Sequence, residues 1–107
     1  MRIAVAAEGP SLQDRVSDRF GRCPYFLIAD TDTWQFTTIP NTPSDLASGL
    51  GLQAAWTVVN QRVSAVIAGE VGRNARSILE ERGVQIVTGM SGLSARQAIE
   101  QYRTGRR

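Results

Sequence analysis

The sequence contains the same strand–turn–helix pattern twice, and this repeat constrains the fold more than any other feature. Residues 66–80 read VIAGEVGRNARSILE and residues 86–100 read IVTGMSGLSARQAIE, with a constant offset of twenty positions. Each copy is an apolar strand, a Gly-x-x-Gly turn, a polar helix cap and an amphipathic helix. The residues that recur in register are Gly69, Gly72, Ala75, Arg76 and Glu80 in the first copy and Gly89, Gly92, Ala95, Arg96 and Glu100 in the second.

Two consecutive units of this kind predict neighbouring parallel strands joined by right-handed crossovers. Their turns then lie at one edge of the sheet, beyond the carboxyl ends of the strands, where open α/β sheets bind ligands. Backbone N–H groups from both helix starts would point at one place, and with nearby arginines they would form a positive hollow for an anion. The simpler alternative is that glycine makes such turns in any α/β protein, whatever it binds.

Composition limits the class of protein. A chain of 107 residues is expected to be one domain, residues 1–107, and 42% hydrophobic with 21% charged residues is ordinary for a globular protein. No apolar run approaches the length of about 20 residues that spans a bilayer, and the apolar start is too short for a signal peptide. We therefore expect a cytoplasmic protein with no membrane partner.

Several residue types are missing altogether. The chain has no histidine, its 12 basic residues are all arginine, and Cys23 is its one cysteine. Ordinary zinc sites, Ser–His–Asp and Cys–His nucleophile pairs, disulfides and Cys-x-x-Cys motifs are thereby excluded within the chain. A net charge of +2 does not indicate nucleic-acid binding. Arginine, with its planar and weakly hydrated head, suits large anions.

The pattern of the whole chain predicts an α/β fold in the order β-β-β-α-β-α-β-α. The first three strands read as a meander and the last two as crossover partners, giving a mixed five-stranded sheet with helices on its faces. The expected strands are 2–7, 24–30, 34–39, 64–68 and 84–88, and the expected helices are 46–60, 74–82 and 94–103.

Smaller patterns add local expectations. Ser94 and Gln97 form a capping box for the last helix. Gly49 and Gly51 are costly near the start of the first helix and suggest that something approaches its backbone closely, unless that helix begins only at about Ser48. The aromatic residues expected at core positions are Trp34, Phe36 and Trp56.

The polar loop 8–23 carries further candidates. Arg19 and Arg22 flank Phe20 and Gly21, where glycine permits a tight backbone and Phe20 is expected to plug the core rather than form an exposed lid. Cys23 follows Arg22 directly. A thiol beside a guanidinium would have a lowered pKa and a larger fraction of thiolate. The alternative is a small buried cysteine with no role.

Four stretches, in this order and spacing, resemble one known family. They are MRIAVAAEG at the start, Ser17-x-x-Phe20-Gly21-Arg22-x-Pro24-Tyr25-Phe26, Asn41 followed by Gly49-x-Gly51-x-Gln53-Ala54-Ala55, and residues 66–75, VIAGEVGRNA. The chain is similar here to the dinitrogenase iron–molybdenum cofactor biosynthesis family, the NifX-type domains also found at the end of NifB proteins. The resemblance implies a ribonuclease-H-like fold, which agrees with the order of elements above.

The resemblance also implies a non-enzymatic carrier of nitrogenase-type metallocofactor biosynthesis. Its cargo would be an iron–sulfur or iron–molybdenum cofactor precursor, or another molybdenum–sulfide cluster, and its partners would be the donor and acceptor proteins of that cofactor. Such sulfide-rich polyanions suit glycine turns, helix starts and arginines. The resemblance and the twin glycine turns together give these candidate binding residues: Arg19, Phe20, Gly21, Arg22, Cys23, Ser48, Gly49, Gly51, Gly69, Gly72, Arg73, Asn74, Gly89 and Gly92.

The sequence departs from the family pattern at the positions that would ligate metal. Arg19 and Ser48 stand where the family often has histidine, Arg73 where it usually has proline, and Cys23 where it often has alanine. A cluster would therefore be held by charge and backbone N–H groups, with Cys23 as the one thiolate ligand. Met90 could add a weak thioether contact, although a packing role is the simpler interpretation.

Two alternatives come from other functional classes. A ribonuclease-H-like hydrolase needs clustered carboxylates that hold two metal ions, and only Glu8 and Glu70 fall near the predicted edge, since Asp30 and Asp32 lie at a hairpin turn. A protein-interaction or nucleic-acid-binding module would use arginines and exposed aromatic rings. The low net charge and the expected core positions of the aromatic residues argue against nucleic acid.

Overall fold

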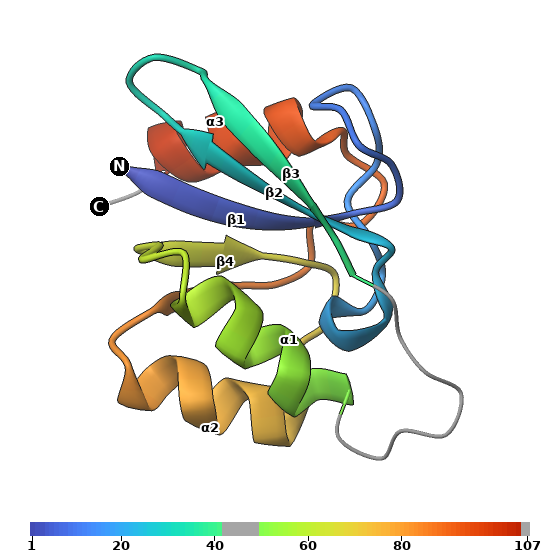
Figure 1. The fold of residues 1–107 in the computed structure, drawn as a ribbon. Coiled ribbons are helices and arrows are strands. Elements are labelled where there is room, and N and C mark those ends of the chain that lie inside the picture. Colours follow the sequence, from blue (N-terminus) through green and yellow to red (C-terminus); the bar gives the residue numbers. More distant parts are fainter. Residues whose placement is uncertain (42–49, 106–107) are drawn as a thin grey trace.

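A computed structural model of the chain describes residues 1–41 and 50–105. The predicted order of elements is confirmed, with one short 3-10 helix, η1, inside the loop that precedes the second strand (Figure 1). The strands are β1 (Arg2–Ala7), β2 (Tyr25–Asp30), β3 (Phe36–Pro40), β4 (Ala65–Ile67) and β5 (Gln85–Val87). The helices are η1 (Phe20–Arg22), α1 (Leu50–Val59), α2 (Arg73–Glu81) and α3 (Ala95–Gly105).

The five strands form one mixed sheet in the order β3-β2-β1-β4-β5. β2 pairs antiparallel with both β1 and β3, while β1, β4 and β5 pair in parallel, so the predicted meander and crossovers are both confirmed. β3, β1, β4 and β5 therefore run in the same direction. The loops that follow β1, β4 and β5 gather at one edge of the sheet, on the right in Figure 1, and both glycine turns are among them.

Two apolar layers hold the sheet between its helices. On one face Phe26 and Val66 pack with Leu79 under α1 and α2, and on the other face α3 covers an apolar layer of its own. Phe20 is 1% exposed, and its ring centroid lies 5.2 Å from that of Phe26, so the prediction of a core plug is confirmed. Burying this ring anchors η1 against the sheet.

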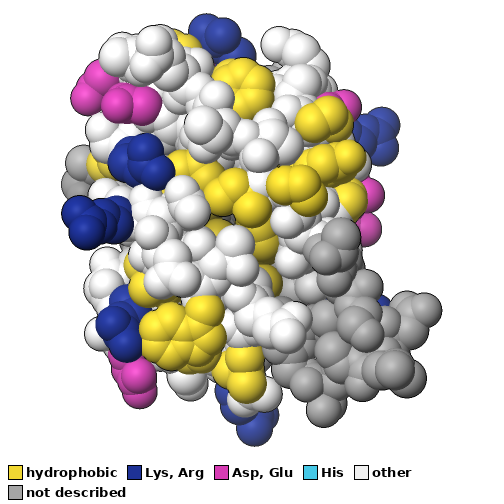
Figure 2. Space-filling model, viewed as in Figure 1, with side chains coloured by type: hydrophobic (Ala, Val, Ile, Leu, Met, Phe, Trp, Pro, Cys, Tyr) yellow, Lys and Arg dark blue, Asp and Glu magenta, His cyan; other side chains and the backbone are white. Residues whose placement is uncertain are grey.

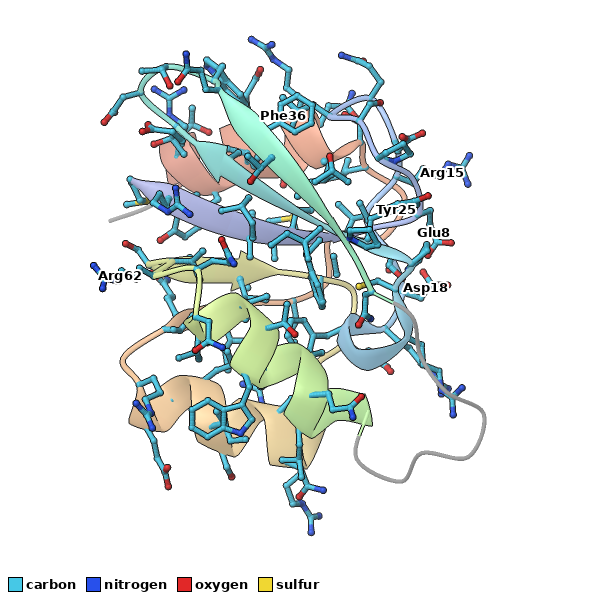
Figure 3. The ribbon with its side chains drawn as sticks, viewed as in Figure 1. Glu8, Arg15, Asp18, Tyr25, Phe36 and Arg62 are labelled. Carbon is cyan, nitrogen blue, oxygen red and sulfur yellow. The ribbon has the colours of Figure 1, made fainter. Side chains whose placement is uncertain are left out.

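The expectation that three aromatic residues fill the core was wrong for two of them. Phe36 is 39% exposed because β3 is the edge strand of the sheet, and it points outward at the top of Figure 3. Trp56 is 41% exposed on the outer side of α1, where the Arg82 guanidinium lies 4.8 Å from its ring centroid. Trp34 is half-buried against the α3 layer under the guanidinium of Arg96, 4.2 Å away.

The loop before η1 crosses the first glycine turn at very short range. The Gly69 N–H donates to the Ser17 carbonyl (2.9 Å), the Glu70 N–H donates to the Asp18 carbonyl (2.8 Å), and the Phe20 N–H donates to the Glu70 carbonyl (2.9 Å). A Cβ atom on Gly69 would lie 2.5 Å from the Asp18 carbonyl oxygen and 2.8 Å from its Cα. Glycine at position 69 is thus explained by this crossing of two backbone segments.

The two glycines of this turn should differ sharply when substituted. We predict that Gly69→Ala lowers the free energy of unfolding by about 1–3 kcal/mol, because neither backbone can move aside without breaking the crossing bonds. Gly72→Ser is the matched control: residue 72 has an ordinary φ of −67°, and a Cβ there meets no atom within 4 Å, so stability should change by less than about 0.5 kcal/mol. Urea unfolding of both variants measures this, and equal losses would contradict it.

Candidate functional site

Most of the predicted site residues meet where η1, the first glycine turn and the start of α2 adjoin. Arg19 precedes η1, its backbone bridges to Glu70, and Arg22 ends η1; both arginine side chains are exposed. η1 packs against α1, and α1 packs against α2. We refer to residues 19–22 and 69–74 together as the α2 corner.

The start of α2 has no side-chain cap. Gly72 is the N-cap residue and makes no side-chain hydrogen bond there. Serine, threonine, aspartate or asparagine usually fills this position and accepts a hydrogen bond from the first N–H groups of the helix. The φ of residue 72 is −67°, which any residue can adopt, and a Cβ atom at this position would meet no atom within 4 Å. Residue 72 therefore provides no side-chain acceptor for the first N–H groups of α2, and the space where its side chain would stand is open.

The charges of α2 run against its own dipole. Arg73 is its first residue and Arg76 follows one turn later, while Glu80 and Glu81 close the helix. The first turn holds no acidic residue and the last turn no basic one, the reverse of what the helix macrodipole favours. This arrangement weakens the helix and raises the positive potential at the α2 corner. The order of charges in RNARSILEE could have been recognised from the sequence.

The start of α3 is closed, which corrects the prediction that two helix starts converge on an anion. The capping box is confirmed, since the Gln97 N–H donates to Ser94 Oγ at 3.1 Å and the Ser94 N–H donates to Gln97 Oε1 at 3.0 Å. The Ala95 N–H donates to the Asp14 carbonyl at 2.8 Å. Loop 8–19 folds back on α3 and uses the N–H groups that a ligand would need.

The two glycine turns nevertheless lie side by side, as expected. The Gly89 N–H donates to the Gly69 carbonyl at 2.9 Å. Gly89 and Gly92 have φ values of 77° and 91°, a left-handed backbone that glycine adopts without strain. In the second turn glycine thus serves the chain's own conformation.

The hollow beside the second turn is not positive, contrary to expectation. A cavity of about 410 Å³ lies between loop 8–18 and residues 91–92. Glu8 and Asp18 line it with Arg15, and these three side chains lie on the same side of the molecule in Figure 3. Two carboxylates against one guanidinium do not favour a large anion. The positive part of this edge is the α2 corner instead.

Cys23 is buried in the apolar layer under α1, which reverses the expected shift of its thiol. Burial raises the pKa of Cys23 to about 12, and this desolvation outweighs the hydrogen bond from the Asn41 side chain. The Asn41 Nδ2 donates to the Cys23 carbonyl at 2.8 Å and lies 3.8 Å from its Sγ. The structure therefore does not support Cys23 as an accessible thiolate ligand.

The remaining candidates have structural surroundings. The Cβ of Ala75 on α2 lies 3.4 Å from where a Cβ of Gly51 would stand, so the close approach at Gly51 is helix against helix. Met90 packs partly buried against the α3 layer. Ser48 and Gly49 lie outside the described residues.

Two general findings concern the described residues, 1–41 and 50–105. Within them no three side chains of the types His, Cys, Asp and Glu come together in a way that could hold a metal ion, so Glu8 and Glu70 do not form the carboxylate cluster that a two-metal hydrolase needs. In the same part of the chain, no helix has the length and apolar character required to cross a bilayer.

Comparison with models of protein families shows to which family the chain belongs. The family model described as "Dinitrogenase iron-molybdenum cofactor" matches residues 1–105. The chain belongs to this family.

Individual proteins are similar to the chain over most of its length. The apo form of the orange protein from Desulfovibrio gigas is 34% identical, with a TM-score of 0.92 over 98% of this chain and 88% of that one. A Thermotoga protein, proposed to be a NifB protein and placed in the DUF35 family, is 36% identical, with a TM-score of 0.84 over 98% of this chain and 89% of that one. The uncharacterized protein MJ0580 of Methanocaldococcus jannaschii is 29% identical over 89 residues, 80% of this chain and 72% of that relative.

The buried thiol leads to a pH-dependent prediction. An unfolded cysteine releases its proton near pH 8.5, whereas burial holds the pKa of Cys23 at about 12. Between these values only the unfolded chain loses the proton, so the stability contributed by the thiol falls as the pH rises, by up to about 1.4 kcal/mol per pH unit. The stability advantage of the natural chain over Cys23→Ala should therefore shrink between pH 8 and pH 10.

Thiol labelling provides the complementary measurement. Iodoacetamide at pH 8 should leave the folded protein unmodified and should alkylate Cys23 only after urea is added. Rapid labelling of the folded chain, or a stability difference that stays constant with pH, would show that the thiol is accessible and would return Cys23 to the list of possible ligands.

Proposed function

We propose that this protein is a non-enzymatic carrier that holds an anionic metal–sulfur cofactor, or a precursor of it, at the α2 corner. The cargo would be an iron–sulfur or iron–molybdenum cofactor precursor, or another molybdenum–sulfide cluster, in metallocofactor biosynthesis of the nitrogenase type. Membership of the dinitrogenase iron–molybdenum cofactor family supports this class of cargo. We also propose that the fold is ribonuclease-H-like.

The observation that carries the proposal is the uncapped, positively charged start of α2. Because Gly72 has no side chain, it does not cap the first N–H groups of α2. Sulfide or oxo atoms of a cluster could accept hydrogen bonds from these groups. The missing Cβ at residue 72 would let a bulky anion approach the backbone. Arg73, with Arg19 and Arg22, supplies the opposite charge.

The strength of such binding follows from its components. An exposed charge at a helix end gains about 0.3–1 kcal/mol, and up to about 2 kcal/mol when partly buried. With three guanidinium groups the total is on the order of several kcal/mol, which corresponds to dissociation constants between about millimolar and micromolar. The chain has no histidine and Cys23 is buried, so the hold is electrostatic and should weaken as salt screens it.

A carboxylate placed at the α2 start tests the proposal directly. We expect anaerobic equilibrium dialysis to show an excess of tetrathiomolybdate, seen as visible absorbance, on the side that contains the natural chain. Gly72→Asp should reduce the affinity at least tenfold, because its carboxylate would cap the N–H groups and repel the anion. Its stability should stay equal or rise slightly, so a folding defect would not explain the loss.

The second copy of the repeat provides the matched control. Ser94→Asp adds the same charge at the start of α3, where the N–H groups are already bonded, and should change the affinity less than twofold. If the natural chain retains no tetrathiomolybdate, or if both variants lose it equally, the α2 corner is not the site.

The arginines give a further prediction. Substituting glutamine for Arg19, Arg22 and Arg73 together should lower the affinity for tetrathiomolybdate and flatten its dependence on salt, because fewer charge pairs remain to be screened. Titration of absorbance at two salt concentrations measures both effects. Binding that is tight and indifferent to salt in the natural chain would point to direct metal ligation instead.

A further inference from the structure

We propose that the outer face of α1 is the docking surface for an acidic partner protein, which would approach the α2 corner from the side. The surface consists of Leu52, Trp56 and Arg82, and we call it the α1 face. This inference rests on the proposed function, because a carrier has to meet the proteins that load and unload it.

The α1 face is apolar where solvent-facing helices usually carry charge. None of the ten residues of α1 is charged. Leu52 and Trp56 are four residues apart and therefore lie on one side of the helix, and they are 39% and 41% exposed. Figure 2 shows hydrophobic side chains over α1 at the lower front of the molecule, with arginine atoms beside them. Leu52 and Trp56 thus offer two large apolar side chains next to each other on an uncharged helix.

Arg82 adds a guanidinium group that stacks on the ring of Trp56. Its guanidinium lies 4.8 Å from the centroid of the Trp56 ring, which holds the side chain flat against α1. In the described part of the chain it forms no ion pair with a carboxylate. Tryptophan and arginine are the residues most enriched among the energetically dominant contacts of interfaces. A partner carboxylate above Arg82, beside an apolar recess for Trp56, would complete this arrangement.

The surrounding charges favour an acidic partner over a second copy of the chain. Helix α2, the α2 corner and Arg82 together hold five arginines and three glutamates, and Asp18 adjoins the corner, which leaves a small excess of positive charge that a second copy would meet with its own. These residues are Arg19, Arg22, Arg73, Arg76 and Arg82, with Glu70, Glu80 and Glu81. Opposite charges on a different protein would instead steer its approach.

The position of the face ties it to the cargo site. Leu52 is in the first turn of α1, η1 packs against this helix, and α2 lies along it. A protein seated on Leu52 and Trp56 would therefore stand beside the α2 corner. A cluster could then pass between the two proteins over a short distance, without crossing open solvent.

A designed peptide tests the chemistry of the surface. The probe is a synthetic helical peptide with leucines along one face and glutamates along both rims, and its control carries lysines in place of the glutamates. We expect the acidic peptide to bind cofactor-free protein at least tenfold more tightly than the basic one at low salt, measured by fluorescence anisotropy of a labelled peptide. Trp56→Ala and Arg82→Glu should each weaken binding at least tenfold.

The second tryptophan–arginine pair supplies the matched control. Arg96 stacks on Trp34 much as Arg82 stacks on Trp56, so Arg96→Glu should change binding less than twofold. Equal binding of the two peptides, no binding of either, or equal losses in Arg82→Glu and Arg96→Glu would overturn the proposal. A dimer in sedimentation that Trp56→Ala dissociates would also overturn it and assign the face to a second copy. Since the peptide assay uses protein without cofactor, its outcome is separate from the tetrathiomolybdate test.

Discussion

The crossing of loop 17–20 over the first glycine turn is the contact on which the geometry of this edge depends. Three backbone hydrogen bonds join the segments, and Gly69 permits the close approach because it has no side chain. The crossing fixes η1, with Phe20 buried beneath it, beside the beginning of α2. Arginines that are more than fifty residues apart in sequence are thereby brought to the same corner of the molecule.

Much of the fold could be predicted because its signals are local. Hydrophobic periodicity, turn glycines and the repeat indicated every strand and α-helix of the described chain within a few residues, but not the short helix η1. The helix starts of the two repeats differ in the structure, and no local sequence pattern predicts the difference. The carbonyls that close the start of α3 belong to Leu12 and Asp14, more than eighty residues earlier in the chain. Within residues 1–41 and 50–105, the start of α2 in the first repeat has no such backbone acceptors.

The site was predicted less well because it depends on burial. Arg22 next to Cys23 predicted a lowered pKa, but the thiol points into the core, and desolvation raises its pKa instead. Trp56 was expected at a core position, yet it lies on the outer side of α1. In helix α2 the order of charges was visible in the sequence. Only the structure shows that the basic end of the helix also lacks a side-chain cap. A helix built against its own dipole sacrifices stability, and such departures from local rules are typical of functional positions.

The burial of Cys23 has a consequence for exchange rates. A chain whose one sulfhydryl stays protonated inside the core forms no coordinate bond that would have to break before a metal-bearing guest departs. Such a guest could leave about as fast as ions rearrange in solution, and soft metals such as copper would find no accessible thiolate. Rapid turnover of cargo would then be a property of the fold itself, obtained by hiding its most reactive atom.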